Sequence, residues 1–381
     1  VSAGYFHTVL LCSDGQAVAI GLDSDGRCSI PELEEGAQYV QVSAGVSHTA
    51  LLRSDGAVTA VGDNRYGQCC IPDLPAGMTY VQVSAGDGHT VMLDSHGYAS
   101  ACGSNSHGQC DLPDLEPGVK YVQVSAGSCF TVLLRSDGQA IAVGSNEGQR
   151  AHIPKLEAGV VYTQISAGYN HTALLCSDGS AVTDHGTFQP ESDIEVVQVS
   201  AGCSNTLLLF SNGRVLATGD NAAQLGACSI PDLEPGVDYV QISAGYRHSA
   251  LLRSDGRAVA VGCNMRGQCV VPDLKANQSW LQWIANNPAL PERVSYIKDC
   301  GERPIVEEPT LVAQMFAHEE GTDQIVLVFV SLSGTELTRL VVSRDEFVAA
   351  VFKEVSEVLH RPQQRLQVVL PDGALLHSSQ D

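Results

Sequence analysis

A tetrapeptide of the form Val/Ile-Ser-Ala-Gly occurs seven times in this chain, and each copy opens a segment built on one plan. The serines of the seven copies are Ser2, Ser43, Ser84, Ser125, Ser166, Ser200 and Ser243. The first five lie 41 residues apart, the next interval is 34 and the last is 43. A recurring period of this length indicates a repeat architecture, in which each unit buries its apolar surface against its neighbours.

One unit, residues 39–79, contains four short runs typical of β-strands, at 39–44, 49–53, 57–61 and 68–71. An Asp-Gly pair between the second and third runs favours the positive φ angles of a tight hairpin, and thus antiparallel pairing. The pair recurs at Asp14, Asp55, Asp137, Asp178 and Asp255. A small four-stranded sheet must stack on neighbours, and radial stacking of seven such sheets gives a β-propeller.

The fold class predicted for residues 1–285 is therefore all-β, a seven-bladed β-propeller. A β-helix or horseshoe is disfavoured because its coils have shorter periods and parallel pairing. The sequence starts partway through the first strand of a unit, and residues 280–283 repeat the pattern of such a strand. We expect this late strand to complete the first blade and close the ring, which removes exposed sheet edges.

The repeated string AGxxHTxLLxSDGxAxAxGxNxxGQC resembles the repeat of the regulator of chromosome condensation family, in its short form, over residues 1–284. The resemblance implies a seven-bladed propeller. It implies no single activity, because members of that family include a nucleotide exchange factor, parts of ubiquitin ligases and inhibitors, and one fold hosts many functions.

The chain is acidic, with 43 Asp and Glu against 21 Lys and Arg and a formal net charge of −22. Binding to nucleic acid is disfavoured because it depends on cationic neutralisation of phosphates. Many of the acids occupy the equivalent loop between units: Glu32, Glu34, Glu35, Asp73, Asp114, Glu116, Glu157, Asp232, Glu234 and Asp273. One interpretation is an acidic face that attracts a basic protein partner. The other is a set of solvated loops that keep the protein soluble.

Histidines and cysteines also recur at fixed positions of the unit. His7, His48, His89, His171 and His248 share one position, where we expect a structural role rather than a metal site. Cys28, Cys69, Cys110, Cys228 and Cys269 share another, and we expect them on the same strand of different sheets, too far apart for disulfides. Unpaired cysteines favour a reducing, intracellular compartment, most simply the cytoplasm, although a targeting segment could precede the sequence given.

No catalytic motif, metal-binding spacing or cofactor fingerprint is present, and no apolar run is long enough to cross a membrane. The sequence therefore predicts a protein that is not an enzyme and uses no cofactor or metal. The shortened fifth unit lacks the signals of its outer strand. A notch at that point would make His185 and Phe188 candidates for partner contact, although simple sequence drift explains the loss equally well.

After residue 285 the repeat ends, and prolines with glutamate-rich stretches predict a linker over 286–323. Two strands, a helix with apolar residues from 347 to 359 and a further strand then follow. Their order and the strings LSGTELTRLVV and RPQQRLQVVLPDGALL resemble ubiquitin over residues 324–376. This resemblance implies an α+β ubiquitin-like (β-grasp) domain at 324–381, incomplete at its C-terminus.

Together these features predict a non-enzymatic scaffold or adaptor that binds protein partners. Two alternatives remain open. The two resemblances in combination suggest a substrate-recruiting or regulatory part of a ubiquitin ligase, with partners in the ubiquitin pathway. The propeller resemblance alone admits a guanine nucleotide exchange factor for a small GTPase.

Overall fold

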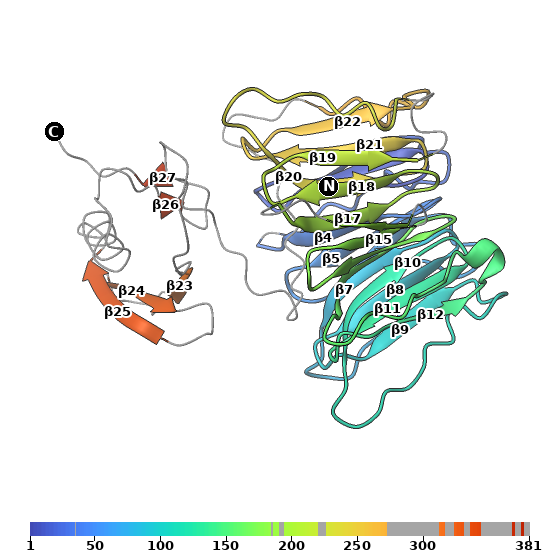
Figure 1. Cartoon of the computed structure of the whole chain (residues 1–381), viewed down its shortest axis with the longest axis horizontal. Coiled ribbons are helices and arrows are strands. Elements are labelled where there is room, and N and C mark those ends of the chain that lie inside the picture. Colours follow the sequence, from blue (N-terminus) through green and yellow to red (C-terminus); the bar gives the residue numbers. More distant parts are fainter. Residues whose placement is uncertain are drawn as a thin grey trace. The chain divides into compact units, whose positions relative to one another are not determined.

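The computed structural model describes residues 1–34, 36–183, 186–189, 194–219 and 226–272, and the backbone of five later strands. The chain divides into two compact units, Val1–Ala289 and Leu290–Asp381, which we describe separately. Figure 1 shows the strands of both. In its described part the first unit consists of seven antiparallel sheets, numbered here as blades 1 to 7 along the chain.

The strands of blades 1 to 4 are β1 (Ser2–Ala3), β2 (His7–Leu11) and β3 (Ala17–Gly21); β4 (Tyr39–Ala44), β5 (His48–Arg53) and β6 (Val58–Gly62); β7 (Tyr80–Ala85), β8 (His89–Asp94) and β9 (Ala99–Gly103); and β10 (Tyr121–Ala126), β11 (Phe130–Arg135) and β12 (Ala140–Gly144). A 3-10 turn, η1 (Glu147–Gln149), follows. Blades 5 to 7 contain β13 (Tyr162–Ala167), β14 (Thr172–Cys176), β15 (Ala181–Thr183) and β16 (Gly186–Phe188); β17 (Val196–Ala201), β18 (Thr206–Phe210) and β19 (Val215–Thr218); and β20 (Tyr239–Ala244), β21 (His248–Arg253) and β22 (Ala258–Gly262).

The middle strand of each blade is buried along almost its whole length, as in β5, where only Arg53 reaches partial exposure. The sequence of a strand that is covered on both faces is a continuous apolar run and does not alternate between apolar and polar residues. An apolar cluster fills each gap between consecutive blades; Leu10 of blade 1, for example, packs with Leu252 of blade 7. Blades 7 and 1 are therefore neighbours, as the adjacent yellow and blue strands of Figure 1 illustrate. The seven sheets form a closed β-propeller, as predicted.

The Asp-Gly turns between the second and third strands are confirmed. In blade 2 the Asp55 carboxylate accepts a hydrogen bond from the Ala57 N–H at 3.0 Å, and Gly56 adopts φ +80°. A side chain is disfavoured at such a positive φ, whereas glycine adopts it without steric cost. The same arrangement closes the hairpins of the other blades that carry the pair.

The predicted fourth strand is wrong for most blades, because six of the seven sheets have three strands each in the described residues. In blade 2 the fourth run begins inside a turn. The Asn64 side-chain oxygen accepts from the Cys69 N–H at 2.9 Å, and Gly67 adopts φ +83°. Because local bonds hold this turn, the following segment does not pair with β6. Instead Ile71 and Leu74 insert between blades 2 and 3.

Blade 5 differs from the prediction in the opposite sense. Of the described sheets in the ring it alone has four strands, because β16 pairs with β15, for example Val182 with Thr187. The expected loss of an outer strand is therefore wrong. The unit has lost the turn and the Pro-containing loop, so the chain returns directly along β15. Phe188 packs against Phe210 of blade 6, with ring centroids 5.4 Å apart, and serves the core between these blades.

Side chains of each blade cover the free edge of the innermost strand of the following blade. Gln41 of β4 accepts from the Val83 N–H at 2.9 Å and donates to the Val83 carbonyl at 2.8 Å. Two residues later, the Ser43 hydroxyl accepts from the Ala85 N–H at 2.9 Å. Equivalent serines do the same around the ring, including Ser243 to the Ala3 N–H across the closure at 2.9 Å. An uncovered row of backbone groups would be left unsatisfied at these edges.

In the second unit, β23 (Val312–Phe316), β24 (Gln324–Val330) and β25 (Glu336–Ser343) form one antiparallel sheet, and β26 (Val368–Val369) pairs with β27 (Leu375–Leu376). Strands at the positions of β24 and β25 were predicted, whereas β23 lies inside the segment predicted as a linker. The predicted helix, the late strand at 280–283 and the ubiquitin-like arrangement as a whole lie outside the described residues.

Candidate functional site

The ring has two ends that carry different loops. At one end, the loop between the first two strands meets the turn after the third strand; the Asp63 N–H, for example, donates to the Ser47 carbonyl at 2.9 Å. We call this the channel-mouth end. At the other, the Asp-Gly turn meets the loop that leads to the next blade, where the Ser54 N–H donates to the Gln38 carbonyl at 2.8 Å. We call this the acidic-loop end.

Each acidic loop is fixed by its apolar and aromatic neighbours. The Tyr39 hydroxyl donates to the Pro31 carbonyl at 3.0 Å, and Leu33 packs into the core between blades 1 and 2. Because alternate side chains point to opposite sides of an extended segment, Glu32 and Glu34 on either side of Leu33 are exposed.

The other candidate acids in described loops are likewise exposed: Asp73, Asp114, Glu116, Glu157, Asp232 and Glu234. Glu35, Asp273 and His185 lie outside the described residues. Phe188, the remaining candidate, is partly buried and packs against the core between blades 5 and 6.

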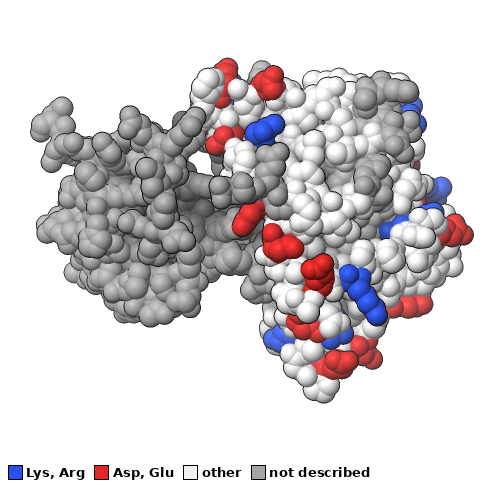
Figure 2. Space-filling model, in the orientation of Figure 1, with Lys and Arg blue, Asp and Glu red and all other residues white. Residues whose placement is uncertain are grey.

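The loop acids differ from the aspartates of the neighbouring turns in their charge balance. Asp55, Asp137 and Asp255 each pair with the arginine two residues before them, at 2.6 Å in every case. Hydrogen bonding from the Ala57 N–H is the main cause of the lowered pKa of Asp55. Glu116 contacts Arg135 at 3.5 Å, whereas the other candidate loop acids form no ion pair with any residue that the structure describes. Figure 2 shows acidic side chains interspersed with basic ones on the face in view.

The repeated histidines hold neighbouring blades together. His89 is fully buried, and its Nε2 lies 3.0 Å from the Thr131 hydroxyl of the next blade, which in turn donates to the Gln109 carbonyl at 2.8 Å. The contact recurs across the closure between His248 and Thr8 at 2.8 Å. Burial lowers the pKa of His7 and His89 to about 3 and that of His48 and His248 to about 4. These imidazoles are therefore neutral spacers between blades.

The repeated cysteines lie on the turn after the third strand, so their predicted placement on a strand is wrong. The Asn64 side chain holds this turn, and the Cys69 thiol donates to the Asp63 carbonyl at 3.4 Å. These thiols are half-exposed and form no disulfide with a described residue. Burial raises the pKa of Cys28, Cys69, Cys110 and Cys269 to about 11, so they are poorly reactive.

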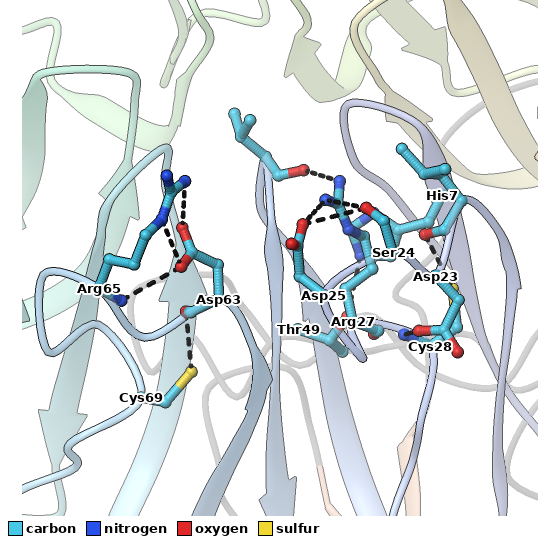
Figure 3. A network of polar contacts seen from close by, with 12 residues as sticks. His7, Asp23, Ser24, Asp25, Arg27, Cys28, Thr49, Asp63, Arg65 and Cys69 are labelled. Carbon is cyan, nitrogen blue, oxygen red and sulfur yellow. Dashed lines mark hydrogen bonds and ion pairs between the residues drawn. The ribbon is translucent and has the colours of Figure 1, made fainter.

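At the channel-mouth end, blade 1 carries Arg27 at the position where blades 2, 3 and 7 carry glutamine. Arg27 is buried, donates to the Val46 carbonyl at 2.8 Å and pairs with Asp25 (Figure 3). In the next blade, hydrogen bonds and charge from Arg65, 2.9 Å away, lower the pKa of Asp63. Two cations and two carboxylates thus neutralise each other on this side of the mouth.

The channel itself opens at this end in a cavity of about 90 Å³. Its wall is the ring of Ala-Gly pairs that ends each innermost strand. The residue after each glycine is tyrosine in three blades and differs among the other four: Tyr5, Val46, Asp87, Ser128, Tyr169, Cys203 and Tyr246. Sequence reasoning missed this group, and it also missed the edge-covering Gln and Ser. For the latter, the Gln-x-Ser spacing was a usable signal, because residues two apart in a strand share a side.

Comparison with known proteins agrees with the propeller. Residues 39–68, 80–109 and 239–268 match the family model of the regulator of chromosome condensation (RCC1) repeat, as the sequence pattern predicts. The CRINKLY WD40 ectodomain of the Arabidopsis thaliana receptor kinase ACR4 is similar over 69% of this chain and 94% of its own, with 17% identity and a TM-score of 0.54. The ectodomain of the Physcomitrella patens receptor kinase CR4 is similar over 68% and 72%, with 16% identity and a TM-score of 0.53.

Yeast RCC1 (Prp20), in a structure with Kap60 bound, is similar over 69% of each chain, with 18% identity and a TM-score of 0.43. No curated protein sequence matches this chain. At identities this low, the likeness to the two receptor-kinase ectodomains shows a shared fold alone. Within the described ranges, the structure contains no helix of the length and apolarity that a membrane span requires.

Proposed function

We propose that this chain is a non-enzymatic protein-interaction module whose acidic-loop end binds a basic surface of a partner protein. The observation that carries the proposal is the contrast between two sets of acids at one end of the ring. Three of the five turn aspartates, Asp55, Asp137 and Asp255, are paired with arginines, whereas most loop acids are exposed and unpaired among the described residues. Unpaired exposed charge of one sign attracts an oppositely charged partner and accelerates association.

The rest of the ring supports a binding role rather than catalysis. The residues that recur from blade to blade have structural contacts: the histidines bridge blades, and the Gln and Ser side chains cover strand edges. Among the described residues, no group of three His, Cys, Asp or Glu side chains is arranged to hold a metal ion. Turnover of a substrate by the purified chain, abolished by a single substitution, would contradict a purely binding role.

The partner is identified by crosslinking and affinity purification from the native source, and the complex is then reconstituted from purified proteins. The test compares two triple variants that change net charge equally. One is Asp73→Asn, Asp114→Asn, Asp232→Asn in the loops; the other is Asp55→Asn, Asp137→Asn, Asp255→Asn in the turns. We expect the loop variant to bind at least tenfold more weakly and to show a shallower dependence of affinity on salt.

The turn variant serves as the matched control, because its aspartates are already neutralised by arginines. Equal weakening by both variants would show that net charge alone matters. Affinity that does not respond to salt would show that the loops do not bind the partner electrostatically. Either result would refute the proposal.

A further inference from the structure

Aromatic rings line the small cavity at the channel mouth, and a carboxylate lies close to one of them. The rings of Tyr5 and Tyr246 stack, with centroids 3.6 Å apart and planes 17° from parallel. The Tyr169 ring meets both rings edge-on, and its centroid lies 6.3 Å from that of Tyr5 and 6.1 Å from that of Tyr246. These residues come from blades 1, 7 and 5, so the ring closure is what brings them together. They form an aromatic wall on one side of the mouth.

Asp87, in blade 3, follows Gly86, which lines the cavity. Burial and then the charge of Asp87 raise the pKa of Tyr169, so the carboxylate lies near this part of the mouth. Asp87 is half-buried, and the Ser128 hydroxyl donates to its carboxylate at 3.5 Å. No Lys or Arg of the described residues pairs with it, in contrast to Asp25 and Asp63 in the two preceding blades. Burial, with a smaller contribution from the charge of Asp63, raises the pKa of Asp87. A carboxylate removed from water without a cation gains from any cation that reaches it.

The size of the cavity limits what can enter. A volume of about 90 Å³ is well below the range of roughly 300–1,000 Å³ typical of sites for whole small molecules. It accommodates the end of one side chain. A cation also gains from aromatic faces within about 6 Å. The exposed Arg247 already shows this at the rim, where its guanidinium lies 5.0 Å from the centre of the Tyr246 ring.

We propose that the channel mouth, between Asp87 and the rings of Tyr5, Tyr169 and Tyr246, binds one cationic side chain, lysine or arginine, of a partner polypeptide. The site lies at the opposite end of the ring from the acidic loops, so it does not depend on the function proposed above. The Asp87 carboxylate receives the hydrogen bonds of the cation, and the tyrosine rings cover its alkyl stem and face its charge.

The test uses the full chain with 3-fluorotyrosine at its tyrosines and follows the ¹⁹F resonances, assigned by single Tyr→Phe substitutions. The probes are N-acetyl-lysine methylamide and N-acetyl-arginine methylamide. The control probe is N-acetyl-norleucine methylamide, which has an apolar side chain and no charge. We expect at least one cationic probe to shift the resonances of Tyr5, Tyr169 and Tyr246, with tyrosines elsewhere unchanged.

Asp87→Asn keeps the shape of the side chain and removes its charge, and it should weaken probe binding about ten- to a hundredfold. Asp73→Asn, in an acidic loop, should leave binding unchanged. The unaffected tyrosine signals report in the same spectrum that the variant is folded. The proposal is overturned if norleucine shifts the same resonances equally, if neither cationic probe shifts them, or if Asp87→Asn binds as well as the native chain.

Discussion

The buried histidines predict a steep loss of stability in mildly acidic solution. Burial holds the pKa of His7 and His89 near 3 and that of His48 and His248 near 4. In the unfolded chain each titrates near 6.5, so below that pH the unfolded state binds protons that the folded state does not. Stability is therefore complete above pH 6.5 and falls as pH decreases towards the folded-state values.

The size of the effect follows from the linkage between protons and folding. Each such histidine costs about 1.4 kcal/mol per pH unit below 6.5. From pH 7.5 to pH 5.5 the four together cost about 5 kcal/mol, a large part of the typical stability of a domain. The carboxylates with lowered pKa, such as Asp55 and Asp63, do not titrate in this interval.

The decisive variant is His89→Phe, because Phe130 already occupies the same position in blade 4. At pH 7.5 the variant loses the contact with Thr131 and should be about 1 kcal/mol less stable. Its stability should then fall by about 1.4 kcal/mol less than that of the native chain on the way to pH 5.5, so the two become similar there. Urea unfolding followed by circular dichroism measures both free energies.

His152→Phe is the matched control, since His152 is exposed and should leave the pH dependence unchanged. Parallel stability curves for the native chain and His89→Phe would refute the reasoning. They would show that the imidazole at this position remains able to ionise in the folded state.

Three further variants test the ring. Gln41→Met removes two hydrogen bonds to the edge of the next blade and should cost about 2–4 kcal/mol in urea unfolding, whereas Gln16→Met, at an exposed turn, should cost less than about 0.5 kcal/mol. Equal costs would contradict the edge-covering role. Gly45→Ala places a methyl group against a carbonyl of the next blade and should lower stability by about 1–3 kcal/mol; an unchanged urea midpoint would show that the blades can separate to admit it. Tyr39→Phe removes the hydrogen bond to the Pro31 carbonyl and should lower the free energy of unfolding by about 1 kcal/mol. An unchanged free energy of unfolding would show that the packing of Leu33 alone fixes the loop.

Sequence reasoning predicted those parts of the fold that local chemistry determines. The Asp55-Gly56 turn requires a positive φ that glycine supplies, so the hairpin could be predicted from two residues. The fourth strand could not be judged from its apolar residues. The Asn64 side-chain oxygen accepts a hydrogen bond from the Cys69 N–H, which makes the segment a turn in place of a strand. The apolar character of the segment does not reveal this bond.

In the candidate site, too, local features could be predicted from the sequence and long-range ones could not. The exposure of Glu32 and Glu34 follows from alternation around Leu33 and could be predicted. The cluster at the channel mouth could not, because Tyr5, Asp87 and Tyr169 are far apart in the chain. Only closure of the ring brings the glycines of all seven innermost strands, and five of the residues that follow them, around one cavity.

The covering of each strand edge by Gln and Ser has a consequence for how such a chain can change length. Six of the seven junctions between described blades use the same Gln and Ser positions in the same direction, and the junction from blade 1 to blade 2 uses the Ser position. The side of a blade that offers these side chains therefore fits the strand edge of any other blade. The junction after the shortened fifth unit keeps its bonds, from the Val199 N–H to Gln164 at 2.8 Å and from the Ala201 N–H to Ser166 at 2.9 Å. One blade could therefore replace another in the ring without loss of these junction bonds. Insertions, deletions and relocated chain ends should be accepted in the outer loops, where no junction bond is made, and rejected within the inner strands.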